Sequence, residues 1–293
     1  MTVPYAEVIG DPIAHSKSPL IHNLWLEKLG LRYDYRRAHV TAEQLPHYLE
    51  QRRSDPDWRG CNVTIPHKES VLRFTDDAEP VVKTLQAANC LTRRAGEAPV
   101  LVADNTDWSG FMEPIQAWAA RDVAYKRAYV IGAGGAAAAV SYALDRAGFL
   151  VININRDMNK ALALRHRLGL FDDDLCTDLK AWSRLESGSR PALADWGDRA
   201  RRSDILVNTT PLGMTGYPEL DVDLEFFPED VLVYDIVYSP LETRLLREAR
   251  RRNMPTVDGL EMLIGQAARA FELFFGEKAP RQFDPELRRL LTS

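Results

Sequence analysis

Short polar strings in the first 110 residues carry side chains that could bind and chemically change a small hydroxylated acid. Residues 16–19 offer two serine hydroxyls at the predicted start of a helix, and Thr64 and Lys68 flank a predicted strand-to-helix turn. Asn89 and the carboxylates of residues 104–107 follow. Each string alone is typical of capping or turn chemistry. Together they supply hydroxyl, amide, ammonium and carboxylate groups, which suit a small polyhydroxylated acid as the ligand.

A glycine-rich string in the second half of the chain is typical of dinucleotide binding. Residues 132–137, Gly-Ala-Gly-Gly-Ala-Ala, fit the pattern G-x-G-x-x-G/A between a predicted strand and a predicted Ala-rich helix. The first glycine permits a tight turn, the second lets the backbone approach a pyrophosphate, and Ala137 allows the helix to pack closely on the strand. Free N–H groups and the helix dipole then hold the anion. A tight turn without a ligand is the alternative interpretation.

The residues after the next predicted strand, at 150–154, indicate which dinucleotide binds. NAD sites usually place an acid there for the ribose hydroxyls, whereas NADP sites often place an arginine near the 2′-phosphate. Arg156 and Lys160 favour the phosphate, and Asp157 favours NAD. Two cations against one anion predict NADP if Asp157 points into solvent. A loop with ordinary surface charges is the alternative.

The elements that position these strings alternate between strand and helix patterns. In the first hundred residues, Ser18 is the predicted N-cap of a helix with Pro19 at its first position, and Pro66 is predicted to start another. Predicted strands lie at 5–9, 33–40, 61–65, 128–131, 150–154, 205–208 and 231–235. This alternation predicts an α/β fold with mostly parallel sheets covered by helices. A length of 293 residues suggests two domains.

Composition argues against several classes of protein. Lys and Arg number 37 against 42 Asp and Glu, so the chain carries a net charge of −5, which is unsuited to nucleic acid. No apolar run approaches the ~18 residues of a membrane span, and the N-terminus lacks the pattern of a signal peptide. The three cysteines are far apart and form no CxxC pair, so we expect a reducing cytoplasm. The six histidines show no metal-ligand spacing, and we expect no metal.

In their order along the chain, the strings resemble those of the shikimate dehydrogenase family. The similarity covers nearly the whole chain and is carried by Ile13-Ala14-His15-Ser16-Lys17-Ser18-Pro19, Asn62-Val63-Thr64-Ile65-Pro66-His67-Lys68, Asn105-Thr106-Asp107, Gly132-Ala133-Gly134-Gly135-Ala136, Asn208-Thr209-Thr210-Pro211-Leu212-Gly213-Met214, Tyr234-Asp235, and Asp258-Gly259-Leu260 through Gln266.

The resemblance implies a two-domain enzyme with its active site in the cleft between the domains. Residues 1–106, completed by C-terminal helices at 259–293, would form an α/β substrate-binding domain, and residues 107–258 a Rossmann-like NADP-binding domain. The implied activity is the reversible NADPH-dependent reduction of 3-dehydroshikimate to shikimate, in aromatic amino acid biosynthesis. The implied partners are small molecules, with no nucleic acid and no membrane. We expect a monomer or a homodimer.

The resemblance also implies a role for individual residues. Lys68 matches the catalytic lysine of the family, with Asp107 as its partner. The implied substrate contacts are Ser16, Ser18, Thr64, Asn89, Tyr234 and Gln266. The implied cofactor contacts are Gly132, Ala133, Gly134, Gly135, Ala136, Asn155, Arg156, Lys160, Leu232 and Gly259.

Two other functions remain open from the sequence. The first is a quinate/shikimate dehydrogenase that uses NAD, or a relative that acts on an amino analogue. The second is a catalytically silent paralogue that binds a shikimate-like ligand. Lys68 and Asp107 argue against the silent paralogue, because a pure sensor does not need a proton donor.

Overall fold

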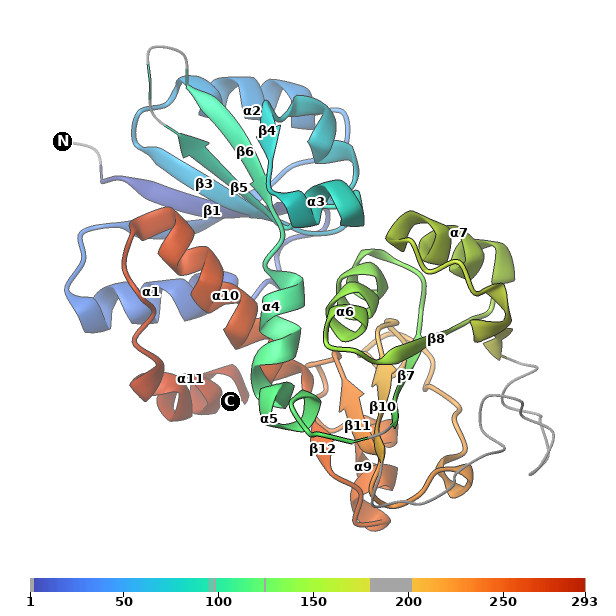
Figure 1. Ribbon diagram of the computed structural model, residues 1–293. Helices are drawn as coiled ribbons and strands as arrows, with labels where there is room; N and C mark the ends of the chain where they lie inside the picture. The colour runs from blue at the N-terminus through green and yellow to red at the C-terminus, as the bar shows by residue number, and fades with distance from the viewer. Residues whose placement is uncertain (1–2, 95, 97–98, 124, 180–201, 293) are drawn as a thin grey trace. The chain divides into compact units, whose positions relative to one another are not determined.

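The computed structural model describes residues 3–94, 96, 99–123, 125–179 and 202–292, and divides the chain into two compact units (Figure 1). Unit 1 contains Met1–Gly110 and Ile264–Ser293, and unit 2 contains Phe111–Leu263. Each unit has its own six-stranded sheet, and helices connect the strands. The predicted α/β class is confirmed.

Unit 1 contains a mixed sheet with the strand order β2-β1-β3-β5-β6-β4. β5 runs antiparallel to β3 and β6, whereas β1, β2 and β3 are mutually parallel. The strands are β1 (Tyr5–Gly10), β2 (Asp34–His39), β3 (Trp58–Val63), β4 (Asp77–Ala78), β5 (Cys90–Arg94) and β6 (Val100–Asp104). The helices are α1 (Ser18–Leu29), α2 (Leu45–Ser54), α3 (Pro80–Leu85), most of α4 (Asp107–Met112), most of α10 (Gly259–Phe275), α11 (Asp284–Thr292), and the 3-10 helices η1 (Ser70–Phe74) and η6 (Arg281–Phe283).

Unit 2 contains an all-parallel sheet with the order β12-β11-β10-β7-β8-β9. The chain order reverses between β7 and β10, and such a switch point is where open α/β sheets bind ligands. The strands are β7 (Tyr125–Ile131), β8 (Leu150–Asn155), β9 (Cys176–Asp178), β10 (Arg202–Asn208), β11 (Leu232–Asp235) and β12 (Thr256–Val257). The helices are α5 (Gln116–Ala119), α6 (Gly135–Arg146), α7 (Met158–Leu168) and α9 (Arg244–Arg251), with 3-10 helices η2 (Glu113–Ile115), η3 (Asp173–Leu175) and η5 (Leu224–Phe226).

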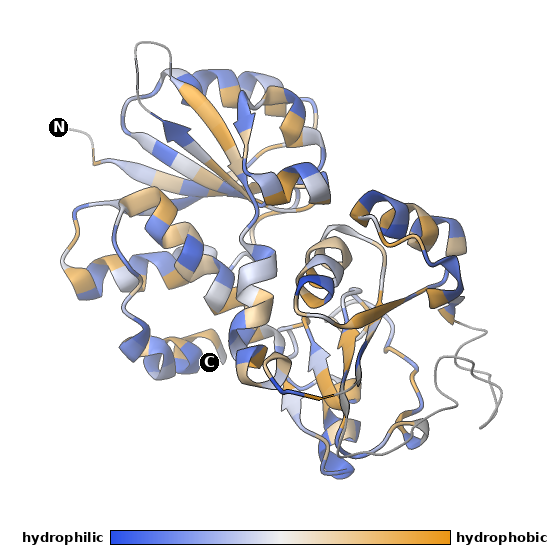
Figure 2. Cartoon of the chain, viewed as in Figure 1, coloured by the Kyte–Doolittle hydropathy of each residue, from blue (hydrophilic) through white to orange (hydrophobic). Residues whose placement is uncertain are grey.

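The core of each unit lies between its sheet and its helices. Figure 2 shows hydrophobic residues along the central strands of unit 2 and hydrophilic residues on the outside of α7. Ile131, Ile154 and Leu206 of this sheet are completely buried. Parallel strands with helices packed on their faces are expected to be apolar where they are buried, as residues 128–131 of β7 and 205–207 of β10 are. None of the helices among the described residues is long and apolar enough to cross a bilayer.

Two local predictions are wrong. Ser18 is the first residue of α1 rather than its N-cap, which is Lys17, and the Ser18 hydroxyl instead lies 3.3 Å from the Ser16 hydroxyl. Pro66 does not start a helix, because residues 64–67 form a turn closed by the His67 N–H on the Thr64 carbonyl at 2.9 Å. Helical structure begins only at Ser70.

Candidate functional site

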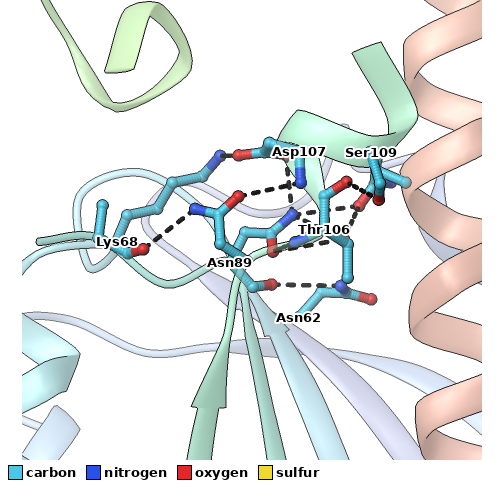
Figure 3. A network of polar contacts seen from close by, with 9 residues as sticks. Asn62, Lys68, Asn89, Thr106, Asp107 and Ser109 are labelled. Atoms are coloured by element: carbon cyan, nitrogen blue, oxygen red, sulfur yellow. Dashed lines mark hydrogen bonds and ion pairs between the residues drawn. The ribbon is translucent and has the colours of Figure 1, made fainter. Parts of the chain in front are cut away.

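A lysine–aspartate ion pair forms the centre of the site in unit 1. Lys68 lies just beyond the turn that follows β3, and Asp107 is the first residue of α4 after β6. Lys68 Nζ lies 2.5 Å from Asp107 Oδ2, and Asp107 is only 6% exposed (Figure 3). The pair therefore holds an ammonium group, which can supply a proton, in one orientation at the ends of two strands.

Asn89 fixes the carboxylate of that pair. Its Nδ2 lies 2.8 Å from Asp107 Oδ1 and 3.0 Å from Thr106 Oγ1, and its Oδ1 accepts a hydrogen bond from the Thr106 N–H at 2.7 Å. The neighbouring Ala88 N–H donates to the Lys68 carbonyl at 2.8 Å. These bonds hold the carboxylate of Asp107 and the backbone of Lys68, so the geometry of the pair is set before any ligand arrives.

Gln266 reaches the same cluster from α10, far along the chain. Its Oε1 lies 3.4 Å from Asn89 Nδ2 and 3.5 Å from Thr106 Oγ1. Gly110 makes this approach possible, because a Cβ at position 110 would lie 2.4 Å from the Gln266 backbone nitrogen. The structure thus brings together Lys68, Asp107, Asn89 and Gln266, as the resemblance implies.

Ser18, with Ser16 beside it, belongs to a second group of buried polar side chains, whereas Thr64 lies just after β3 with its N–H on the Ile9 carbonyl at 3.0 Å. Ser18 is buried and hydrogen-bonds the Tyr35 hydroxyl, which donates to Asn62 Oδ1 at 2.6 Å. Asn62 Nδ2 in turn donates to the Asn89 carbonyl at 3.2 Å. Burial raises the pKa of Tyr35 well above its usual value, so this hydroxyl stays a donor. Within the described residues, no hydrogen bond joins Ser16, Ser18 or Thr64 directly to the Lys68–Asp107 pair.

Asn62, Thr106 and Tyr35 also take part in these two hydrogen-bonded groups, although the sequence predicted no role for them. Asn62 and Thr106 stand inside the polar strings, at the ends of strands, where a signal was present. Tyr35 lies within β2, and nothing in its spacing distinguishes it from an ordinary core residue.

The glycine-rich turn of unit 2 joins β7 to α6 and has the geometry of an anion site. Gly132 has a φ of 127°, and a Cβ there would lie 2.3 Å from Thr209 Oγ1, so only glycine fits. Gly134 is the exposed N-cap of α6, and a Cβ added to it would meet no atom within 4 Å. No side chain of the described residues caps α6, so its first N–H groups remain available to a pyrophosphate. Ala133 and Ala136 are half-buried in the same turn.

After β8, the side chains of Arg156 and Lys160 are available to a ligand, whereas the carboxylate of Asp157 caps a helix. Asp157 is the N-cap of α7, and its Oδ1 accepts hydrogen bonds from the N–H groups of Asn159 and Lys160 at 3.1 and 3.4 Å. Its carboxylate is therefore turned to the helix end rather than simply to solvent. The Arg156 and Lys160 side chains are exposed and have no side-chain partner within the described part of the chain. Asn155 Nδ2 donates to the Asp157 carbonyl at 2.9 Å.

Two of the implied contacts lie deep inside unit 2. Leu232 and Tyr234 are 4% and 0% exposed within β11, and the Tyr234 ring stacks on Phe111 with centroids 4.8 Å apart. Their burial argues against direct contact with a ligand. Ile236 and Tyr238 follow the strand and are half-buried. The carboxyl end of a strand, rather than its interior, is the position from which ligands are reached.

Comparison with known proteins agrees with the motifs. The family description "Shikimate dehydrogenase substrate binding domain" matches residues 8–91, and "Shikimate 5'-dehydrogenase C-terminal domain" matches residues 259–283. A shikimate dehydrogenase (NADP(+)) of Sphingopyxis alaskensis is 48% identical over 292 residues, which are 99% of this chain and 97% of that protein. The chain belongs to the shikimate dehydrogenase family.

Solved structures in or near this family share the fold. The shikimate 5-dehydrogenase of Thermus thermophilus, in complex with NADP(H) and shikimate, has a TM-score of 0.79 and 34% identity, over 98% of this chain and 99% of that chain. A quinate dehydrogenase of Corynebacterium glutamicum, in complex with NAD, has a TM-score of 0.82 and 26% identity, over 98% of each chain. The resemblance seen in the sequence is confirmed at the level of the family.

Proposed function

We propose that this protein catalyses the reversible reduction of 3-dehydroshikimate to shikimate with NADPH, a step of aromatic amino acid biosynthesis. The observation that carries the proposal is the Lys68–Asp107 pair, with its 2.5 Å contact and its fixed surroundings. The relatives at 38–48% identity that are named NADP-dependent shikimate dehydrogenases support the same substrate and cofactor. The chain is an oxidoreductase.

The residues of unit 1 bind the substrate and manage one proton. The Lys68 ammonium donates a hydrogen bond, and then a proton, to the oxygen that becomes a hydroxyl during reduction, and it stabilises the negative charge that develops there. Asp107 orients Lys68 and accepts from a substrate hydroxyl. Asn89 and Gln266 present amide groups beside that pair. Ser16, Ser18 and Thr64 then supply hydroxyls for the rest of the substrate; Ser16 and Ser18 hold its carboxylate.

The residues of unit 2 fit a dinucleotide. The open space beside Gly134, where a Cβ would meet no atom within 4 Å, and the uncapped start of α6 suit a pyrophosphate. Gly132 through Ala136 would hold the pyrophosphate, and Arg156 and Lys160 the 2′-phosphate. Asn155, the last residue of β8, and Gly259, the first residue of α10, stay proposed cofactor contacts. When bound, NADPH supplies the hydride.

The two units divide these tasks. Unit 1, with the C-terminal helices, is the proposed substrate domain, and unit 2 the proposed nucleotide domain. The three cysteines are free, buried thiols, which fits the proposed reducing cytoplasm. A monomer or a homodimer remains the expected state.

The alternative is a quinate or shikimate dehydrogenase that prefers NAD. Asp157 after β8 and the likeness to an NAD-bound quinate dehydrogenase favour it. Initial rates with shikimate and quinate, each with NADP⁺ and NAD⁺, separate the two functions. The proposal requires the highest kcat/KM for shikimate with NADP⁺. No turnover with either acid would leave the silent paralogue or a relative that acts on an amino analogue.

A further inference from the structure

A buried amide–carboxylate pair joins the loops that follow β10 and β11. Asn208 and Asp235 are the last residues of these adjacent strands, and both are completely buried. Asn208 Nδ2 donates to Asp235 Oδ1 at 2.9 Å. The pair lies at the carboxyl end of the sheet, on the side of the switch point opposite to β8.

Asn208 also holds the loop after β10. Its Oδ1 accepts from the Thr210 N–H at 3.0 Å and from the Thr210 hydroxyl at 2.7 Å, and its Nδ2 lies 3.0 Å from the Leu212 carbonyl. One side chain thus ties residues 210 and 212 to the end of the strand.

Asp235 does the same for the loop after β11. Its Oδ1 accepts from the Val237 N–H at 3.0 Å, and its Oδ2 accepts from the Thr243 hydroxyl at 2.7 Å. Thr243 is the N-cap of α9, so the carboxylate also fixes the start of that helix. The two loops and the helix form one hydrogen-bonded unit.

Both loops contact residues of the proposed nucleotide site. The Thr209 hydroxyl donates to the Ile131 carbonyl at 2.7 Å. Thr209 Oγ1 is also the atom that a Cβ on Gly132 would meet at 2.3 Å. A Cβ on Gly259 would lie 2.3 Å from the Ile236 carbonyl oxygen. A displacement of either loop would therefore change the surroundings of Gly132 or Gly259.

Burial of the Asp235 carboxyl group disfavours its ionised form. Burial raises the pKa of Asp235 from 3.8 to about 6, even though three hydrogen bonds favour its ionised form; the carboxylate of Glu219 also raises this pKa. An asparagine could accept from Asn208 and Val237 in the same shape, but its amide nitrogen could not accept from the Thr243 hydroxyl. The acid is therefore the side chain that ties both loops and the start of α9 together, and perturbed buried acids gather at functional sites.

We propose that Asn208 and Asp235 are a positioning pair for the dinucleotide, which holds the two loops that shape the nicotinamide half of its site. The adenosine half belongs to the β7–β8 side, where Arg156 lies, so the other half falls to the β10–β11 side of the switch point. The inference rests on the proposed function and deepens it.

The test compares two probes that share the adenosine half. NADPH contains both halves, whereas 2′,5′-ADP contains only the adenosine and its 2′-phosphate. Calorimetric titration of Asp235→Ala should show NADPH binding about tenfold weaker or more, the equivalent of one lost charged hydrogen bond. Binding of 2′,5′-ADP should change by less than about twofold, since its contacts lie across the switch point. Asp235→Asn should give the same pattern with a smaller loss.

The matched control is Asp204→Ala. Asp204 is also a buried acid of β10, near the other end of that strand, where its Oδ1 accepts from the Arg127 N–H. We expect it to leave the ratio of the two affinities unchanged.

Equal weakening of both probes by Asp235→Asn would reduce the pair to a structural role and overturn the inference. Unchanged NADPH binding by the Asp235 variants would overturn the inference as well. Because Asp235→Asn keeps the shape of the side chain, it decides the question even if the alanine variant does not fold. A wild-type protein that binds 2′,5′-ADP and NADPH equally would also contradict the inference, whereas one that binds neither would refute the proposed function itself.

Discussion

Replacement of Arg156 by alanine should remove most of the preference for NADP over NAD. The Arg156 side chain is exposed after β8 and has no side-chain partner among the described residues, so it is free to bind a phosphate. Each charged hydrogen bond to the 2′-phosphate is worth about 1.5–3 kcal/mol. We therefore expect Arg156→Ala to lower the ratio of kcat/KM for NADP⁺ to that for NAD⁺ by roughly ten- to a hundredfold.

Replacement of Asp157 by asparagine should shift the cofactor preference in the opposite direction, towards NADP. Its carboxylate caps α7, so Asp157→Asn keeps a capping side chain and removes only the charge. Repulsion between like charges a few ångströms apart in water costs on the order of 1 kcal/mol, before salt screening. The variant should accordingly raise the same ratio, by up to about fivefold.

The assay measures initial rates with saturating shikimate and each cofactor, in the wild type and both variants. A wild-type ratio below one would refute the NADP assignment. A ratio above one that Arg156→Ala leaves unchanged would keep the cofactor and reject Arg156 as the residue that recognises it. Added salt should reduce the ratio in the wild type, because exposed charges are screened.

Three further outcomes are expected. Lys68→Met should keep NADPH binding and lower kcat by roughly 10²–10⁴-fold, the usual contribution of a placed acid; Asp107→Asn should also lower kcat, and unchanged turnover in either folded variant would remove that residue from the chemistry. Shikimate should be preferred to quinate by a kcat/KM ratio on the order of 10², because pocket shape around Ser16 and Ser18 rejects an added hydroxyl only modestly; a ratio at or below one would contradict this. Because the pKa of Asp235 is raised to about 6, its carboxyl group binds a proton more readily in the folded protein than in the unfolded chain. The ionised carboxylate therefore lowers the free energy of unfolding above pH 6 by up to about 3 kcal/mol. This destabilisation disappears below about pH 4, where the carboxyl group is protonated in both states. Asp235→Asn should therefore melt no lower than the wild type at pH 7.5, with any gain lost at acid pH, and a melting temperature clearly below that of the wild type at pH 7.5 would show that the charge stabilises the fold.

Features that depend on local spacing could be predicted from the amino-acid sequence alone. The turn at 132–137 was identified with its flanking strand and helix, because glycine positions and apolar runs are local properties. The strands at 5–9 and 205–208 were predicted to within one residue of β1 and three residues of β10 for the same reason. The string that ends in Lys68 and the one that ends in Asp107 were each visible as strand-end chemistry.

Which of these groups meet depends on contacts between segments that are distant in the sequence. Asn89 and Gln266 lie 177 positions apart, and their contact depends on how α10 packs against Gly110. Local pattern also could not separate Tyr234, inside β11, from Tyr238, beyond its end, because both follow apolar residues. Nor could it show that Asp157 caps a helix. Strand order, burial and long-range hydrogen bonds arise from contacts between distant segments, and no local spacing encodes them.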